Sequence, residues 1–145
     1  MYIKTVAFGN SSEAFVENRL TEGFNIIYSQ DDNNKGKTIL IQSMMYALGN
    51  EPIFPESFPF KEYYHVCIVE SDGVEYTILR KGKEYLVRYG DVLEQYSNTT
   101  EFKDFLSSTF SIYRCYQLME KINSFILICS IKCFSSVKIR GTVLI

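Results

Sequence analysis

The sequence lacks the features that mark membrane, secreted and strongly basic proteins. Its longest apolar run, Phe125 to Ile131, is far shorter than the ~20 residues that cross a bilayer. The first residues, Met1 to Thr5, alternate like a strand and contain no apolar h-region of a signal peptide. The formal charge is only −2, which argues against a strongly basic nucleic-acid module. We therefore expect a cytoplasmic protein without a membrane partner.

Metal-binding and redox residues are also scarce. The chain has one histidine, His65, and its cysteines (Cys67, Cys115, Cys129 and Cys133) form no CxxC element. A zinc site with four ligands would need nearly all of these residues at poor spacing. We expect reduced, buried thiols. We also expect His65 to pack in the core or at a sheet edge, because no nucleophile motif accompanies it.

What is present indicates one ordinary globular domain with an unusual tail. The chain has 145 residues, of which 46% are hydrophobic and 22% are charged. Residues 1–120 contain all 17 acidic residues, whereas 121–145 contain four basic residues and no acid. We divide the chain into a lobe, 1–122, and an apolar, basic tail, 123–145. The tail could add one or two strands, or could lack its proper continuation, and we find no chemistry in it.

The N-terminal third predicts strands. Residues 2–8 are rich in β-branched and aromatic side chains, and Gly9 to Ser12 is a turn signal. Residues 14–20 fit a second strand or a short helix, and a hairpin is preferred. The run 24–28 is almost wholly apolar, as expected of a strand that is buried on both faces.

A helix is predicted over 38–48. Its apolar residues recur at helical spacing on one face: Leu40, Ile41, Met44, Met45 and Leu48. Gly49 stands where a C-terminal cap belongs, and prolines keep 50–60 irregular.

The second half predicts a β-meander and another helix. Runs 63–70, 74–80 and 84–89 are separated by glycine-containing turns, which indicates antiparallel strands over 63–89. The sequence Ser97-Asn98-Thr99 is a capping signal for a helix over about 99–110. A further helix over about 112–122 is a weaker prediction.

The candidate site is the polar loop 31–38, between the strand 24–28 and the helix. A phosphate-binding loop has the pattern G-x-x-x-x-G-K-[ST] and joins a buried strand to a helix. Gly36-Lys37-Thr38 matches the last three positions, whereas Asp31 replaces the first glycine. A carboxylate there repels phosphate unless it points outward or binds through a cation.

Each residue of this loop has a physical role in phosphate binding. Gly36 lets the backbone approach the anion, Lys37 places a charge between the β- and γ-phosphates, and the Thr38 hydroxyl is offered to Mg²⁺. Asn34 tolerates a left-handed backbone conformation. The amides of Lys35, Gly36 and Lys37 complete the cradle, and Ile39 is the next residue of the predicted binding segment.

The segment resembles the start of an ABC-type ATPase head. The strand Asn25-Ile26-Ile27-Tyr28, the Gly-Lys-Thr turn and the helix ending in Ala47-Leu48-Gly49 are similar to those of structural-maintenance-of-chromosomes (SMC), RecF-like and AAA-type ATP-binding proteins. The resemblance is specific over residues 1–50 and loose to about 110. It makes Asn33 the counterpart of the family's loop asparagine. It implies an α/β fold: a P-loop NTPase half-domain with a mixed sheet, an antiparallel meander and a helix after the phosphate loop.

The departures from the family are as informative as the matches. The chain contains neither a Walker B strand nor a Leu-Ser-Gly-Gly signature, which in the family lie beyond a long coiled coil. The resemblance therefore implies ATP and Mg²⁺ binding by an N-terminal lobe, with catalysis by Lys37 dependent on a complementary C-terminal lobe or a second head. DNA contact is expected only through that larger assembly.

Two weaker candidates and two alternatives stay open. Gln117 could correspond to the family's magnesium-contacting glutamine, and Lys61 could approach phosphate, although both fit ordinary surface residues. The chain could instead be a different P-loop protein, such as a kinase or GTPase, although it lacks an Arg-rich lid and a base-reading Asn-Lys-x-Asp motif. It could also be a degenerate, non-catalytic scaffold or dimerisation module.

Overall fold

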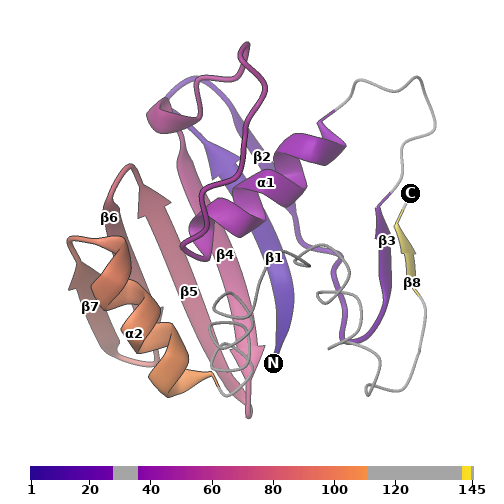
Figure 1. Cartoon of the computed structure of the whole chain (residues 1–145). Coiled ribbons are helices and arrows are strands. Elements are labelled where there is room, and N and C mark those ends of the chain that lie inside the picture. The colour runs from indigo at the N-terminus through magenta and orange to yellow at the C-terminus, as the bar shows by residue number, and fades with distance from the viewer. Residues whose placement is uncertain (28–35, 111–141, 145) are drawn as a thin grey trace, which may run out of the picture.

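The computed structural model describes residues 1–27, 36–110 and 142–144 of the chain. Its elements are β1 (Tyr2–Gly9), β2 (Ala14–Glu17), β3 (Asn25–Ile27), α1 (Lys37–Ala47), the 3-10 turn η1 (Phe60–Glu62), β4 (Tyr64–Ser71), β5 (Val74–Lys81), β6 (Glu84–Tyr89), β7 (Val92–Tyr96), α2 (Thr99–Thr109) and β8 (Thr142–Leu144). The fold is therefore α/β, as the sequence predicts (Figure 1).

The main sheet has six strands in the order β2-β1-β4-β5-β6-β7. The preferred hairpin of β1 and β2 and the predicted meander of β4, β5 and β6 are confirmed. The resemblance implies a mixed sheet, whereas among the described residues every pairing in this six-stranded sheet is antiparallel. Parallel pairing occurs in a separate two-stranded sheet of β3 and β8.

The position of β3 corrects a second expectation. An apolar run without alternation predicts a strand that is covered on both faces. Within the described residues, however, β3 pairs only with β8 and lies apart from the six-stranded sheet (Figure 1). Ile26 on this strand is 43% exposed and the preceding Phe24 is 55% exposed. A strand is buried on both faces only when other elements pack on each side of its sheet. Among the described residues, no element packs on both sides of β3 in this way.

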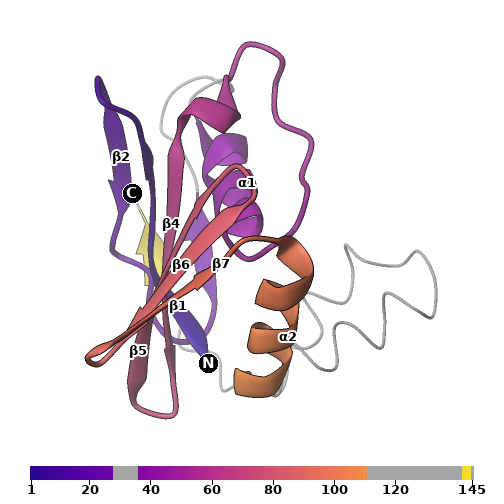
Figure 2. The same ribbon diagram turned by 90° about the vertical axis from the view of Figure 1, so that its left-hand side faces the viewer.

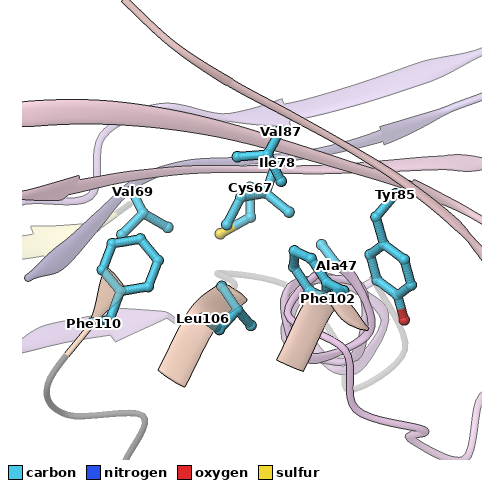
Figure 3. Packing of buried hydrophobic residues seen from close by; sticks show 9 residues of the cluster. All are labelled: Ala47, Cys67, Val69, Ile78, Tyr85, Val87, Phe102, Leu106 and Phe110. Atoms are coloured by element: carbon cyan, nitrogen blue, oxygen red, sulfur yellow. The ribbon is translucent and has the colours of Figure 1, made fainter. Parts of the chain in front are cut away.

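Both helices lie on one face of the six-stranded sheet (Figures 1 and 2). Helix α1 contacts β1, β4 and β5, while α2 contacts β6 and β7. The core fills the space between these helices and the sheet (Figure 3), and its fully buried members are Ala47, Cys67, Val69, Ile78, Tyr85, Val87, Phe102, Leu106 and Phe110. Cys67 is a free thiol, as expected, and burial raises its pKa to about 12.

Helix α1 is confirmed, but its buried face is rotated from the predicted one. Leu40, Ser43, Tyr46 and Ala47 are buried, whereas Ile41 is 41% exposed. The small side chains of Ser43 and Ala47 allow the helix to pack closely on the sheet, so this face of α1 is buried instead of the one with the longer apolar residues. Gly49, with φ of 84°, follows the helix as the predicted cap.

Helix α2 follows its sequence signals closely. The Asn98 side-chain oxygen accepts a hydrogen bond of 2.9 Å from the Glu101 amide, which caps the helix. Phe102 stacks on Tyr85 of β6 at a centroid distance of 4.1 Å. The predicted face of Phe102, Phe105, Leu106 and Phe110 points to the core, with Phe105 only partly buried.

One element was missed and others lie outside the described residues. The sequence interpretation contains no strand over Val92–Tyr96, yet β7 completes the sheet after the Gly90-Asp91 turn. Of the tail, only β8 is described, and it forms a strand. The predicted helix over 112–122 lies outside the described residues.

Candidate nucleotide-binding site

Helix α1 begins directly after Gly36, the glycine of the predicted phosphate loop. Gly36 adopts a left-handed conformation (φ 80°, ψ −5°), and its carbonyl accepts the first helical hydrogen bond, 2.9 Å from the Leu40 amide. The first four amides of any helix lack intrahelical acceptors, and Gly36 offers no side chain to cap them. The helix start therefore presents a positive dipole end with no acidic residue in its first turn.

The glycine at position 36 is required by backbone conformation. A Cβ built on Gly36 meets no atom of the described residues within 4 Å, so steric crowding by these residues is not the reason for glycine. A positive φ is unfavourable for residues with a side chain, however, and this is the reason for glycine here. The backbone conformation of the turn into α1 therefore favours glycine at position 36.

The structure describes four of the seven predicted binding residues. Gly36, Lys37, Thr38 and Ile39 form the consecutive start of α1, with Thr38 exposed and Lys37 and Ile39 partly exposed. Asn33, Asn34 and Lys35 lie outside the described residues, as does Asp31. The structure therefore brings the Gly-Lys-Thr motif to a helix N-terminus, and the loop that would wrap the anion remains a prediction.

At the opposite end, α1 is clamped by Arg80 of β5, which the sequence interpretation missed. This side chain is 2% exposed, and its Nη1 donates to the carbonyls of Tyr46 and Asn50, each at 2.9 Å. Its Nε donates to the Gly82 carbonyl at 2.9 Å, and its Nη2 forms an ion pair with Glu51. The guanidinium thus satisfies backbone carbonyls at the helix end, where a cation also complements the dipole.

The same guanidinium stacks between two aromatic rings. It lies 3.6 Å from the ring centroid of Tyr46 on α1 and 4.9 Å from that of Tyr85 on β6. A signal for this role exists in the sequence: Arg80 follows Ile78 by two residues and so faces the core side of β5. A charged residue in the buried phase of a strand is expected to have partners.

His65 lies beside this clamp in an aromatic cluster. It is fully buried, and one ring nitrogen, Nε2, lies 2.9 Å from the Phe60 carbonyl. Tyr46 and Phe54 contact its ring at centroid distances of 4.9 and 5.7 Å. Burial, and to a lesser degree the Arg80 charge, lower the pKa of His65. The core assignment made from sequence is confirmed.

The weaker candidates gain little. Lys61 lies in η1, where its amine is 5.8 Å from the Phe60 ring centroid, and Gln117 is outside the described residues. A hollow of about 450 Å³ lies between the end of α1 and the start of α2, and no predicted binding residue lines it. Among residues 1–27, 36–110 and 142–144, no group of three or more His, Cys, Asp or Glu side chains could hold a metal ion.

The same described residues contain no helix that is long and apolar enough to span a membrane.

Comparison with known proteins yields a distant, partial relationship. No protein-family model matches the sequence. The chain is similar to Lamassu protein LmuB of Bacillus cereus (strain VD014), with 28% identity over 89 residues. The matched region covers 61% of this chain and 16% of the relative.

Proposed function

We propose that this chain is the N-terminal, nucleotide-binding part of an SMC/RecF-like ATPase, and that it binds ATP with Mg²⁺ at the start of α1. One observation carries the proposal: the Gly-Lys-Thr motif coincides with a left-handed glycine that opens a helix. Helix N-termini bind anions because their amides and dipole point at the ligand. A Gly-Lys-Thr sequence that occurs by chance has no preference for a left-handed glycine directly before a helix.

Each residue has a separate task in this site. The amides after Gly36 bind the phosphates, and the Lys37 amine neutralises charge between the β- and γ-phosphates. The Thr38 hydroxyl is a ligand for Mg²⁺, which suits an exposed position at the helix start. Asn33, Asn34 and Lys35 supply the rest of the cradle, and Ile39 continues it into the helix.

Hydrolysis needs groups that this sequence does not contain. Phosphoryl transfer to water requires a residue that orients the nucleophile and charges that stabilise the γ-phosphate. Neither a Walker B carboxylate nor a signature motif occurs among these residues. We therefore expect the chain to bind nucleotide and to hydrolyse it poorly until a complementary C-terminal lobe or second head completes the site. DNA contact would require that assembly.

The similarity to Lamassu protein LmuB supports a narrower biological role. The family resemblance by itself is compatible with DNA repair, chromosome organisation or defence against foreign DNA. Among these, we favour an ATPase subunit of a Lamassu-type system.

Isothermal titration of the full chain with ATP and MgCl₂ tests the proposal. We expect saturable binding by the wild type and a loss of at least about tenfold in affinity for Lys37→Ala, since one charged contact to phosphate contributes ~1.5–3 kcal/mol. Lys83→Ala, in the exposed turn between β5 and β6, is the matched control and should bind like the wild type.

Three results would contradict the proposal in different ways. A folded wild type without measurable ATP affinity would indicate a degenerate scaffold. A preference for GTP would indicate another class of P-loop protein. Rapid turnover of ATP by the purified chain, abolished in Lys37→Ala, would show that hydrolysis needs no second lobe.

A further inference from the structure

The face of the six-stranded sheet that points away from α1 and α2 carries an unusual apolar row. Strand alternation places Val66, Leu79 and Leu86 on this face, which no described helix covers and which we call the bare face, because their neighbours Cys67, Ile78 and Val87 are buried beneath the helices. The register pairs Val66 with Leu79 and Leu79 with Leu86, and it extends the row through Ala7 to Val16. Five adjacent strands thus present apolar side chains in one line.

A solvated sheet face normally carries polar side chains at these positions. Here the row side chains are partly exposed, and Val16 is 58% exposed. Both described helices lie on the other side of the sheet (Figure 2). An apolar line of this kind, flanked by charged residues, has the arrangement of an interface: an apolar centre and a polar rim.

The size of the bare face suits a partner of similar extent. With strands ~4.8 Å apart and ~3.3 Å per residue, the 39 residues of the six strands present about 600 Å². One side of a standard stable interface buries ~800 Å² of accessible surface, which is the same order. A second sheet of the same size would cover the face, as in aligned sheet-on-sheet layers.

The charges around the row favour a second copy of this chain as the partner. On β6, Glu84 and Arg88 are both exposed on the bare face, one on either side of Leu86 and about 6.6 Å from it along the strand. Among the described residues neither makes an ion pair. A two-fold axis along the apolar row would lay Leu86 on Leu86 of the second copy. It would also bring Glu84 opposite the second copy's Arg88, and the reverse.

The neighbouring strands agree with the same axis. On β4, Tyr64 and Ile68 lie on either side of Val66, so the axis would set the 46% exposed Tyr64 ring on Ile68 of the second copy. On β5, the Lys81 amine lies 4.0 Å from the Tyr64 ring centroid in the same chain; the axis would set Lys81 opposite Thr77, within side-chain reach of Glu75 of the second copy. Lys4 already pairs with Glu75 at 2.8 Å, so the contact of Lys81 would extend an existing ion pair. No like charges meet directly among these pairs.

We propose that the bare sheet face is a homodimer interface, in which two copies stack face to face about a two-fold axis along the row of Val66, Leu79 and Leu86. This interface is on the side opposite to the proposed nucleotide site and does not depend on it. Dimerisation should therefore occur without ATP, and it can fail or succeed independently of nucleotide binding.

Sedimentation velocity of the full chain, without nucleotide and over a concentration series, tests the interface. We expect a monomer–dimer equilibrium for the wild type and at least about a tenfold weaker dimer for Leu86→Lys, since a buried like-charged pair opposes association. Ile53→Lys is the matched control, because Ile53 is 89% exposed on a loop outside this face, and it should dimerise normally. Circular dichroism verifies that each variant is folded.

Charge exchange makes the test specific to the proposed axis. Glu84→Arg and Arg88→Glu each create like-charged pairs and should weaken the dimer, whereas the double variant should restore it to within about threefold of the wild type. A wild type that is monomeric throughout the series would overturn the proposal. So would a double variant as weak as its parents, or an Ile53→Lys variant that dissociates as Leu86→Lys does.

Discussion

Removal of the Arg80 side chain should be the most destabilising single change at the end of α1. The guanidinium donates to three backbone carbonyls, those of Tyr46, Asn50 and Gly82, and is 2% exposed. Arg80→Ala leaves these acceptors without their donor in a site from which water is largely excluded. It also removes the stack on Tyr46 and opens a cavity between α1 and the sheet.

The magnitude follows from how much of each partner stays buried. Hydrogen bonds to a charged group contribute ~1.5–3 kcal/mol each, but such terms are not additive, and breaking a buried charge cluster costs ~3–5 kcal/mol in total. We expect Arg80→Ala to lose about 4 kcal/mol of unfolding free energy by this comparison. The Glu51 side chain is 67% exposed, so its pair with Arg80 is screened and Glu51→Gln should cost less than about 1 kcal/mol.

Urea unfolding of the full chain, followed by circular dichroism, measures both variants against the wild type. Arg80→Lys is an informative intermediate, because it keeps the charge but loses the planar fork that reaches two carbonyls at once. It should fall between the other two variants. A loss below about 1 kcal/mol for Arg80→Ala would refute the argument that this residue clamps the helix. An equal loss for Glu51→Gln would show that the ion pair, rather than the carbonyl bonds, carries the stabilisation.

Three further predictions concern single polar groups. The pKa of His65 is lowered in the folded state, so the unfolded state binds more protons in acid. The contribution of neutral, buried His65 to the free energy of unfolding should therefore be fully present above about pH 6.5 and decrease as the pH falls below it. His65→Phe should flatten this pH dependence in urea titrations at several pH values. The buried Ser43 hydroxyl has no hydrogen-bond partner among the described residues. Ser43→Ala should therefore add roughly 1 kcal/mol to the free energy of unfolding and raise the melting temperature. A lowered melting temperature would indicate that the hydroxyl has a partner. Asn98→Ala removes the cap of α2 and should cost ~1 kcal/mol in thermal unfolding, while Asn98→Asp should keep most of it.

Local signals in the sequence predicted most of the fold correctly. The Asn98 cap, the helix end at Gly49 and the alternation in β4, β5 and β6 depend on residues that are close in the chain, so the sequence alone is enough to predict them. β7 was not predicted because its short run, Val92–Tyr96, mixes exposed apolar and polar residues without a clear strand pattern. Its pairing with β6 is what makes it a strand. Tertiary context decides such edge strands.

The errors concern which faces are buried. The face of α1 was assigned to the largest apolar residues, whereas contact with the sheet selected Ser43 and Ala47 for their size. Two of the three carbonyls that Arg80 binds are 30 and 34 residues away, at Asn50 and Tyr46, so the local pattern shows that Arg80 faces the core but not which helix end it binds. In the candidate site, the predicted helix start at residue 38 is one residue after the observed start at Lys37, while the loop residues Asn33 to Lys35 lie outside the described residues.

The two ends of α1 should therefore be separable by mutation. The proposed phosphate site lies at its N-terminus and the Arg80 clamp at its C-terminus, about 16 Å apart along an 11-residue helix. Thr38 at the first end is exposed, so a change there removes ligand contacts and little packed structure. Arg80 is buried, so a change there loosens the helix as a whole. Thr38→Ala should consequently lose Mg²⁺-dependent ATP affinity at nearly unchanged stability. Arg80→Lys should lose stability while retaining ATP affinity at temperatures where it stays folded. If both variants instead lost ATP affinity in proportion to their loss of unfolding free energy, the start of α1 would have a structural role only and would not be a nucleotide site.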